Sequence, residues 1–167
     1  MFNLLRYATM KFILPSILCL FFSQCANPPE YPIEPQLSFI GLSKSNMKQG
    51  AINADSLLVT VGFTDGDGDI GTDDSLSLFV TDTRDNFLAA KYKLPFVAEQ
   101  GAANGISGEI SFVLESTCCY YPDIIPPCTP STVYPKDTVI YTVMIKDRAG
   151  NKSNQLALPM IFLDCTK

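Results

Sequence analysis

Seven stretches of the chain combine apolar residues with β-branched or aromatic residues, in alternation or in short runs, and this pattern is typical of half-buried β-strands. They are Leu37–Leu42, Ser56–Phe63, Ser75–Thr81, Lys91–Val97, Glu109–Leu114, Thr138–Lys146 and Gln155–Leu163. Segments rich in Asp, Asn and Gly separate them, and we find no convincing amphipathic helix. The pattern therefore predicts an all-β fold in which seven antiparallel strands form a sandwich.

The last predicted hairpin points to a particular kind of sandwich. Its turn has the sequence Asp-Arg-Ala-Gly-Asn at residues 147–151, and it resembles the closing turn of bacterial Ig-like and fibronectin-III-like domains. Gly150 and Asn151 suit such a turn because both residue types tolerate positive φ. The resemblance implies an Ig-like or fibronectin-III-like sandwich over residues 37–167, with this turn at the same end as the loop that follows the second strand.

Residues 1–24 have the features of a secretory signal peptide. They carry Arg6 and Lys11 but no acidic residue, and the eleven residues Phe12–Phe22 form an apolar run. This run is too short to cross a bilayer, which takes about 20 residues, whereas a basic start and a short apolar core are typical of a signal. Translation starts either at Met1 or at Met10, because the chain from Met10 would itself make a compact signal.

The end of this run, Phe-Ser-Gln-Cys at residues 22–25, resembles the lipobox of bacterial lipoproteins, in the looser form seen in Bacteroidota. The resemblance implies that Cys25 is lipidated and anchors the chain to a membrane of the cell envelope, most simply the outer membrane, on a face that the sequence leaves open. The alternative is plain secretion, with Cys25 an ordinary cysteine. Residues 25–36 would then form a linker, which its prolines make extended and semi-rigid.

A wider resemblance covers most of the predicted domain. The segments 37–44, 55–57 and 63–71, together with the last hairpin, are similar to uncharacterised Bacteroidota envelope lipoproteins with Ig-like domains. That resemblance implies a fold and a location, and it carries no established activity.

An aspartate-rich loop follows the second predicted strand. It contains five carboxylates, Asp65, Asp67, Asp69, Asp73 and Asp74, and glycines alternate with the first three. Ca²⁺ takes six to eight oxygen ligands, and such a loop is able to converge several of them. The loop is not an EF-hand, because Ile70 and Leu76 stand where that motif needs Gly and Glu.

The Ig-like order would bring Asp147 and Asn151 to the same end of the domain, where they could complete the coordination. We therefore expect a structural calcium site formed by the five aspartates of the loop with Asp147 and Asn151. Two alternatives stay open, an acidic turn that is simply solvated and an ion whose binding is sensed functionally.

Four cysteines lie in the predicted domain: Cys118, Cys119, Cys128 and Cys165. An even number in an exported domain predicts two disulfides, with three possible connectivities. A direct bond between the adjacent cysteines would be strained, so we expect one of them to pair with Cys128 and the other with Cys165. Zinc is a weaker alternative, because the spacing lacks a C-x-x-C pair.

The loop of residues 120–137, which contains Cys128, is rich in aromatic residues and proline. Tyr120, Tyr121 and Tyr134 are candidates for a binding surface, since aromatic anchors dominate many interfaces. The alternative, which we favour, is a disulfide-closed loop that packs its own apolar residues.

Composition removes several classes of function. The chain has no histidine and a net charge of −5, which excludes Ser-His-Asp and Cys-His catalysis and disfavours nucleic-acid binding. We expect a non-catalytic envelope lipoprotein whose domain binds or scaffolds an envelope protein or a glycan. The alternatives are an accessory carbohydrate-binding or adhesion protein and, less favoured, a hydrolase that uses a carboxylate pair such as Asp67 and Asp147.

Overall fold

The computed structural model describes residues 30–50, 54–98, 105–122 and 124–166 of the chain. The predicted signal peptide, Cys25 and the first part of the linker lie outside the described residues. None of the described residues belongs to a helix with the length and apolar character that crossing a membrane requires.

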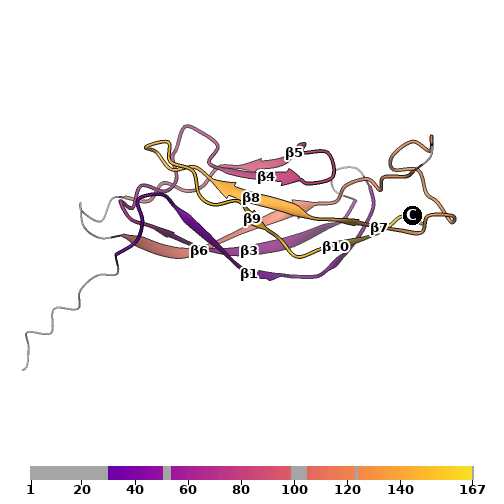
Figure 1. The fold of residues 1–167 in the computed structure, drawn as a ribbon, viewed down its shortest axis with the longest axis horizontal. Coiled ribbons are helices and arrows are strands. Elements are labelled where there is room, and N and C mark those ends of the chain that lie inside the picture. Colours follow the sequence, from indigo (N-terminus) through magenta and orange to yellow (C-terminus); the bar gives the residue numbers. More distant parts are fainter. Residues whose placement is uncertain (1–29, 51–53, 99–104, 123, 167) are drawn as a thin grey trace, which may run out of the picture.

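The described residues form ten β-strands and no helix (Figure 1). The strands are β1 (Gln36–Leu42), β2 (Asn46–Lys48), β3 (Ser56–Asp65), β4 (Leu78–Asp82), β5 (Leu88–Tyr92), β6 (Ile106–Glu115), β7 (Lys136–Val139), β8 (Tyr141–Ile145), β9 (Leu156–Ala157) and β10 (Ile161–Asp164). They make three sheets, in the orders β1-β3-β6, β2-β10-β7 and β5-β4-β8-β9. All neighbours are antiparallel except β2 and β10, which run parallel.

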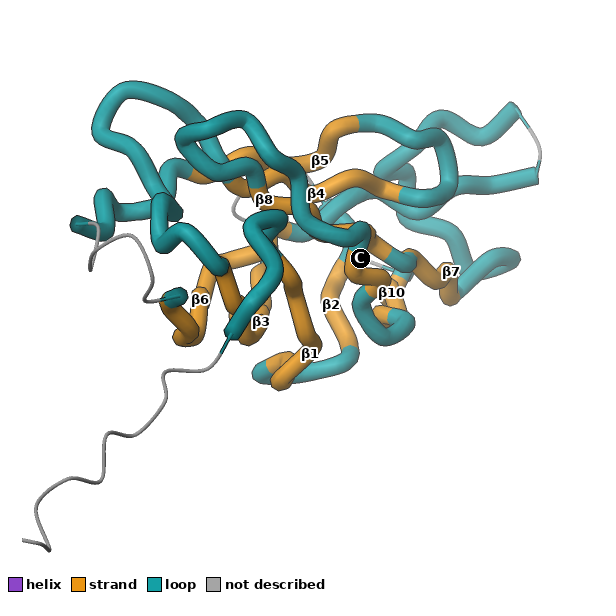
Figure 2. The backbone as a smooth tube through the Cα atoms, turned by 60° about the vertical axis from the view of Figure 1, so that its left-hand side comes forward, coloured by secondary structure: helices purple, strands orange, loops and turns teal. Residues whose placement is uncertain are grey.

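Alternation along the strands places one face of each main sheet in a common core. In β8 the burial alternates strictly, and Tyr141, Val143 and Ile145 are at most 1% exposed. In β3 the buried positions include Val59 and Val61, both 0% exposed. Figure 2 shows β4, β5 and β8 in one layer above β1, β3 and β6 in the other. The all-β architecture predicted from the sequence is present, and it is consistent with a β-sandwich.

The structure divides two of the seven predicted strands and adds a short one. The carbonyl of Ile140 accepts hydrogen bonds from the amide and the hydroxyl of Thr83, which separates β7 from β8. Pro159 lies between β9 and β10, and proline has no amide hydrogen to contribute to a ladder. The added strand is β2, whose three residues are too few for a periodic pattern.

The predicted strand Lys91–Val97 is shifted towards the N-terminus. In the structure β5 ends at Tyr92, and Pro95 follows soon after. The amides beyond β5 leave the ladder: that of Leu94 donates to the Ser77 hydroxyl, and that of Val97 donates to the Ile70 carbonyl. This segment therefore belongs to the loops at the end of the domain where Asp65 lies.

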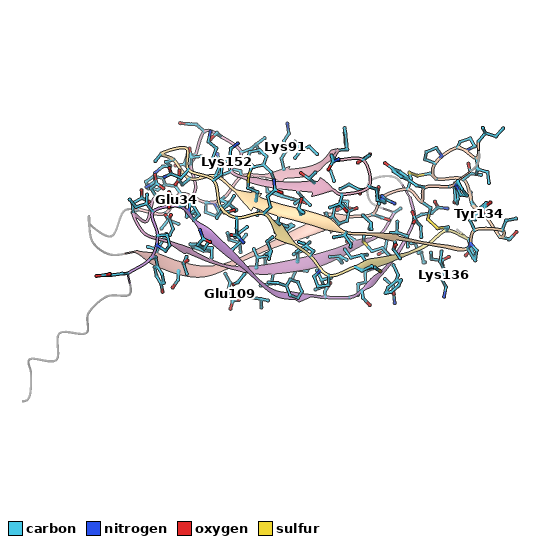
Figure 3. The ribbon with its side chains drawn as sticks, viewed as in Figure 1. Glu34, Lys91, Glu109, Tyr134, Lys136 and Lys152 are labelled. Atoms are coloured by element: carbon cyan, nitrogen blue, oxygen red, sulfur yellow. A yellow bond between two sulfur atoms is a disulfide. The ribbon has the colours of Figure 1, made fainter. Side chains whose placement is uncertain are left out.

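The described chain is elongated, and its two ends differ in content (Figure 1). One end holds the loop after β3, the turn after β8 and the start of the described chain. The other holds the C-terminus and the loop that contains three of the cysteines. Figure 3 places Glu34 and Lys152 at the first end and Tyr134 and Lys136 at the second.

Candidate metal centre

Four carboxylates from two separate loops meet at the first end of the domain. Asp65 is the last residue of β3, Asp67 and Asp69 lie in the loop that follows, and Asp147 lies just after β8. One carboxylate oxygen from each lies within 4.8 Å of the others. We call this group the acidic cluster. It brings together positions that are about eighty residues apart in sequence, as the Ig-like order had led us to expect for Asp147.

The backbone of the loop is shaped by two glycines and one apolar anchor. Gly68 and Gly71 have positive φ values of 71° and 77°, a conformation that glycine adopts without strain. A Cβ on Gly71 would lie 1.8 Å from the carbonyl oxygen of Pro95, so no side chain fits there. Ile70, which stands where an EF-hand has glycine, is 2% exposed and packs in the hydrophobic core. The core thus holds the loop that carries the aspartates.

Among the described residues, hydrogen bonds reach at most one carboxylate oxygen of Asp65, Asp67 and Asp69. The Asp69 amide donates to Asp65 Oδ2 at 2.9 Å, and the Ala149 amide donates to Asp69 Oδ2 at 2.8 Å. The Oδ1 atoms of Asp65, Asp67 and Asp69 are buried, and none has a hydrogen-bond partner among the described residues. Buried polar atoms are normally satisfied, and these three oxygens lie where they could bind a metal ion.

The fourth member of the acidic cluster is held by its own turn. Asp147 Oδ1 accepts hydrogen bonds from the amides of Gly150 at 2.6 Å and Asn151 at 2.7 Å. The side-chain amide of Asn151 donates to Asp147 Oδ2 at 2.8 Å. Asn151 therefore orients Asp147.

Burial and repulsion between carboxylates disfavour the ionised forms of Asp65 and Asp69. Asp65 is 0% exposed, and burial, together with the charges of Asp67, Asp69 and Asp147, raises the pKa of its carboxyl group to about 6. Burial also raises the pKa of Asp69, followed by repulsion from Asp147 and Asp67.

Arg148 lies close enough to Asp69 for its charge to oppose the rise in the pKa of that carboxyl group, and its guanidinium also donates hydrogen bonds to backbone carbonyls. It donates to the carbonyls of Ile70, Gly71 and Val97 at 3.0–3.2 Å, and it stacks over the ring of Phe96 at 4.6 Å. It thereby ties the loop after β3 to the segment after β5 and to the turn after β8.

The donor set fits a hard divalent cation. All four groups offer carboxylate oxygens, which are the ligands of Ca²⁺ and Mg²⁺. An ion among the three unsatisfied oxygens would replace repulsion by attraction. These aspartates could hold the ion directly.

The remaining predicted ligands lie outside the acidic cluster. Asp73 and Asp74 are exposed. The Asp74 amide donates to the Thr72 hydroxyl, and the backbone carbonyl of Asp73 accepts a hydrogen bond from Lys93. Their proximity to Asp69 in sequence therefore did not predict their positions.

The cysteines at the other end are paired in one of the two ways left open by the sequence. Cys118 is bonded to Cys128 and Cys119 to Cys165, with Cα atoms 4.6 and 6.0 Å apart. All four candidate thiolates are used in this way, so none of them is available to zinc. Cys119 and Cys165 are 0% exposed, so their bond joins the C-terminal strand to the core.

We call the end of the domain that contains the two disulfides the disulfide end. A buried glutamine there forms hydrogen bonds with several segments. Gln49 is 4% exposed, and its side-chain amide donates to the carbonyls of Cys165 at 2.8 Å and Thr129 at 3.2 Å. Its Oε1 accepts from the Cys119 amide at 3.1 Å. Nothing in the sequence around Gln49 singles it out, because its partners lie far along the chain.

The three candidate tyrosines make contacts within the protein. Tyr120 lies under the guanidinium of Arg84, 4.2 Å from the ring centre, and its hydroxyl donates to Asp85 at 2.6 Å. The rings of Tyr121 and Tyr134 are 6.0 Å apart, and the Tyr121 hydroxyl donates to the Thr129 carbonyl at 2.6 Å. The tyrosines thus pack within the protein, whereas two apolar side chains of the same loop do not, since Ile124 is 102% exposed and Val133 is 76% exposed.

Arg84 is a second residue that the sequence did not single out. Its guanidinium forms ion pairs with Asp82 at 2.7 Å and with Asp137 at 2.9 Å, and it donates to the carbonyl of Cys118. Both carboxylates are thus balanced by a cation of the protein itself.

Comparison of the chain with protein-family models, with curated proteins and with solved structures gives no match.

Proposed function

We propose that this protein is a non-catalytic lipoprotein of the cell envelope. Its Ig-like domain acts as a binding or scaffolding module, and a structural calcium ion holds one end of that domain together. The observation that carries the proposal is the acidic cluster, in which the buried Oδ1 atoms of Asp65, Asp67 and Asp69 have no partner among the described residues.

The strand order supports the Ig-like type. In immunoglobulin constant domains the first, second and fifth strands share one sheet, and the third, sixth and seventh strands share the other. The sheet β1-β3-β6 corresponds to the first set, and β5-β4-β8-β9 corresponds to the second with an added edge strand. The pairing of β4 with β8 and of β8 with β9 follows the same scheme.

The chemistry of the acidic cluster favours calcium over magnesium. Mg²⁺ usually keeps several of its waters and binds through one or two carboxylates, whereas Ca²⁺ accepts many oxygens in flexible geometry. Four converging carboxylates, three of which are also fixed by backbone amides, suit the larger ion. A structural role follows from the position, because the ion would join the loop after β3 to the turn after β8.

The proposed lipid anchor is inferred from the sequence of residues 22–25. Replacing Cys25 with Ser should move the protein from the membrane fraction to the soluble fraction of the cell that produces it. The unchanged protein should appear in the soluble fraction only after the membranes are treated with detergent. If the Cys25→Ser protein stays in the membrane fraction, the lipid anchor is refuted.

A thermal melt of the purified full chain tests the ion. At a calcium concentration a hundred times its dissociation constant, binding should stabilise the fold by about 2.7 kcal/mol. For a domain of this size the melting temperature should rise by on the order of 10 °C relative to EDTA. Magnesium at the same concentration should produce a smaller shift.

Two matched variants give this melt its specificity. Asp67→Ala removes a member of the acidic cluster and should abolish the calcium shift. Asp73→Ala removes an exposed carboxylate of the same loop, outside the cluster, and should leave the shift unchanged. Equal shifts in both variants, or no shift in the unchanged protein, would refute a calcium site at the acidic cluster.

A further inference from the structure

The start of the described chain lies against the loop of the acidic cluster. The amide of Gly66 donates a hydrogen bond to the carbonyl of Pro32 at 2.8 Å. Gly66 stands between Asp65 and Asp67, so the hydrogen bond comes from within the predicted ion-binding loop. The segment of residues 30–35, here called the entry segment, leads into β1 at Gln36.

The contact at Gly66 is too close for any side chain. A Cβ on Gly66 would lie 2.4 Å from the carbonyl oxygen of Tyr31 and 2.6 Å from that of Pro32. Gly66 is not among the glycines with positive φ. Its lack of a side chain therefore serves the close approach of the entry segment and not an unusual backbone conformation.

A second glycine, Gly105, also lies against Tyr31, and we call the space between Gly66 and Gly105 the seat of Tyr31. A Cβ on Gly105, just before β6, would lie 2.7 Å from Cδ2 of the Tyr31 ring and 3.0 Å from the carbonyl oxygen of Asp65. The ring and backbone of Tyr31 thus lie between two glycines. One of these belongs to the loop of the acidic cluster, and the other contacts the backbone of Asp65.

We propose that ion binding at the acidic cluster fixes the direction in which the entry segment leaves the domain. Without the ion, repulsion among the carboxylates opens the loop and displaces Gly66 from the Pro32 carbonyl. With the ion, the loop closes and the seat for Tyr31 and Pro32 forms. The ion site itself is supported by the unpartnered Oδ1 atoms of Asp65 and Asp69, whose residues are 0% and 8% exposed.

This inference rests on the proposed calcium site and adds a regulatory role to it. Coupling between two sites is reciprocal, so seating of the entry segment must strengthen ion binding by the same factor by which the ion strengthens seating. In a chain anchored upstream of residue 30, calcium would switch the junction between tether and domain from a flexible to a fixed orientation. The free calcium concentration outside the membrane would then control how the domain is presented.

The chain contains no tryptophan, so a single introduced tryptophan reports on one place only. Tyr31→Trp in the purified full chain places this reporter in the seat between the two glycines. Adding calcium to the EDTA-treated protein should shift its emission to shorter wavelength and lower its quenching by acrylamide about twofold or more, since a buried indole is shielded from water.

Two further variants provide the controls. Ile33→Trp places the reporter in the same segment at a side chain that is 58% exposed, and its emission should not respond to calcium. Gly66→Ala keeps every aspartate but blocks the approach of Tyr31 and Pro32. In the Tyr31→Trp background it should abolish the fluorescence change, and it should weaken calcium binding, measured by calorimetry, about fivefold or more.

The outcomes separate the inference from the proposal on which it rests. Calcium binding in calorimetry together with shielding of the Tyr31→Trp indole, lost in Gly66→Ala, supports the coupling. Calcium binding without a change in the indole overturns the coupling and leaves the ion site intact. Absence of calcium binding to the unchanged chain overturns the ion site and the coupling with it.

Discussion

Strand β3 has a carboxylate at each end, and the two groups behave in opposite ways. Asp55, immediately before the strand, is paired with Lys44 and accepts hydrogen bonds from the amides of Lys48 and Ser56. The hydrogen bond from Lys44, followed by that from the Lys48 amide, lowers its pKa from 3.8 to about 2. Asp65, the last residue of the strand, has a pKa raised to about 6, because it is buried beside other carboxylates.

The same contrast extends to the two ends of the domain. At the disulfide end, two covalent bonds hold the loops, and Arg84 neutralises Asp82 and Asp137. At the acidic end, among the described residues, no disulfide joins the loops, and three anionic oxygens lack a partner. The disulfide end contains the groups that satisfy its own charges. The acidic end has four carboxylates that could hold a metal ion.

The largest expected effect on the free energy of unfolding concerns the disulfide end. Loss of the Cys119–Cys165 bond, by Cys119→Ala with Cys165→Ala, should lower the free energy of unfolding by about 4 kcal/mol, because the bond closes a loop of 46 residues. Loss of Cys118–Cys128, which closes a loop of 10, should lower it by about 3 kcal/mol. Denaturant unfolding measures both. If loss of Cys119–Cys165 destabilises the protein less than loss of Cys118–Cys128, the bond that closes the longer loop is not the main constraint.

The next largest effect tests whether Arg84 stabilises the fold by neutralising the buried carboxylate of Asp82. Arg84→Met should lower the free energy of unfolding by about 3 kcal/mol, because Asp82, at 4% exposure, loses its cation. Adding Asp82→Asn to this variant should restore part of the loss. Lys44→Met, which breaks the more exposed pair with Asp55, is the matched control and should lose less than about 1 kcal/mol. Equal losses would show that the burial of Asp82 is unimportant.

Neutralising one aspartate should change the free energy of unfolding in opposite directions at the two ends. In EDTA, Asp67→Asn should raise the free energy of unfolding by about 1 kcal/mol, since it removes one of several mutually repelling charges. Asp82→Asn should lower it, because there the carboxylate is paired with Arg84. Asp73→Asn, at an exposed position, should change it by less than about 0.5 kcal/mol. A destabilising Asp67→Asn in EDTA would mean that the acidic cluster is already balanced within the protein.

The smallest effect follows from the pKa of Asp55. A carboxyl group whose pKa is lowered on folding stabilises the fold above its ordinary value of 3.8, and this contribution disappears as the pH falls through about 2. Asp55→Asn should therefore lower the free energy of unfolding by about 0.5–1 kcal/mol at neutral pH. The difference should shrink as the pH falls below about 4.

Unfolding curves of the Asp55→Asn variant and the unchanged protein across this pH range measure the effect. Asp74→Asn, at an exposed position, is the control. A difference that stays constant down to about pH 2.5 would refute the lowered pKa of Asp55.

Local sequence was sufficient for the parts of the structure that depend on neighbouring residues. The alternation in β3 and β8 predicted strands, because side chains of successive residues point to opposite faces. The aspartates at 65, 67 and 69 lie on one short loop, so their convergence was predictable from spacing and the intervening glycines. Likewise, a direct bond between Cys118 and Cys119 was disfavoured by geometry alone.

Contacts between distant segments decided the rest. Which of the two adjacent cysteines bonds to Cys165, and why Gln49 is buried between them, depends on how the C-terminal strand reaches the loop after β6. Asp73 and Asp74 carry the same chemistry as Asp69, yet both are exposed and lie outside the acidic cluster. Residue type predicted a ligand, whereas backbone direction determined whether it could converge with the others.

The sequence by itself determined an all-β chain with two disulfides and a cation-binding composition in one loop, because strand periodicity, cysteine number and carboxylate spacing are local properties. Only the tertiary structure decided that Asp147 joins Asp65, that Arg84 balances Asp82, and that Gly66 receives the entry segment. These are encounters between parts of the chain far apart in sequence. They exist because burial of the common core brings the loops at each end of the domain together.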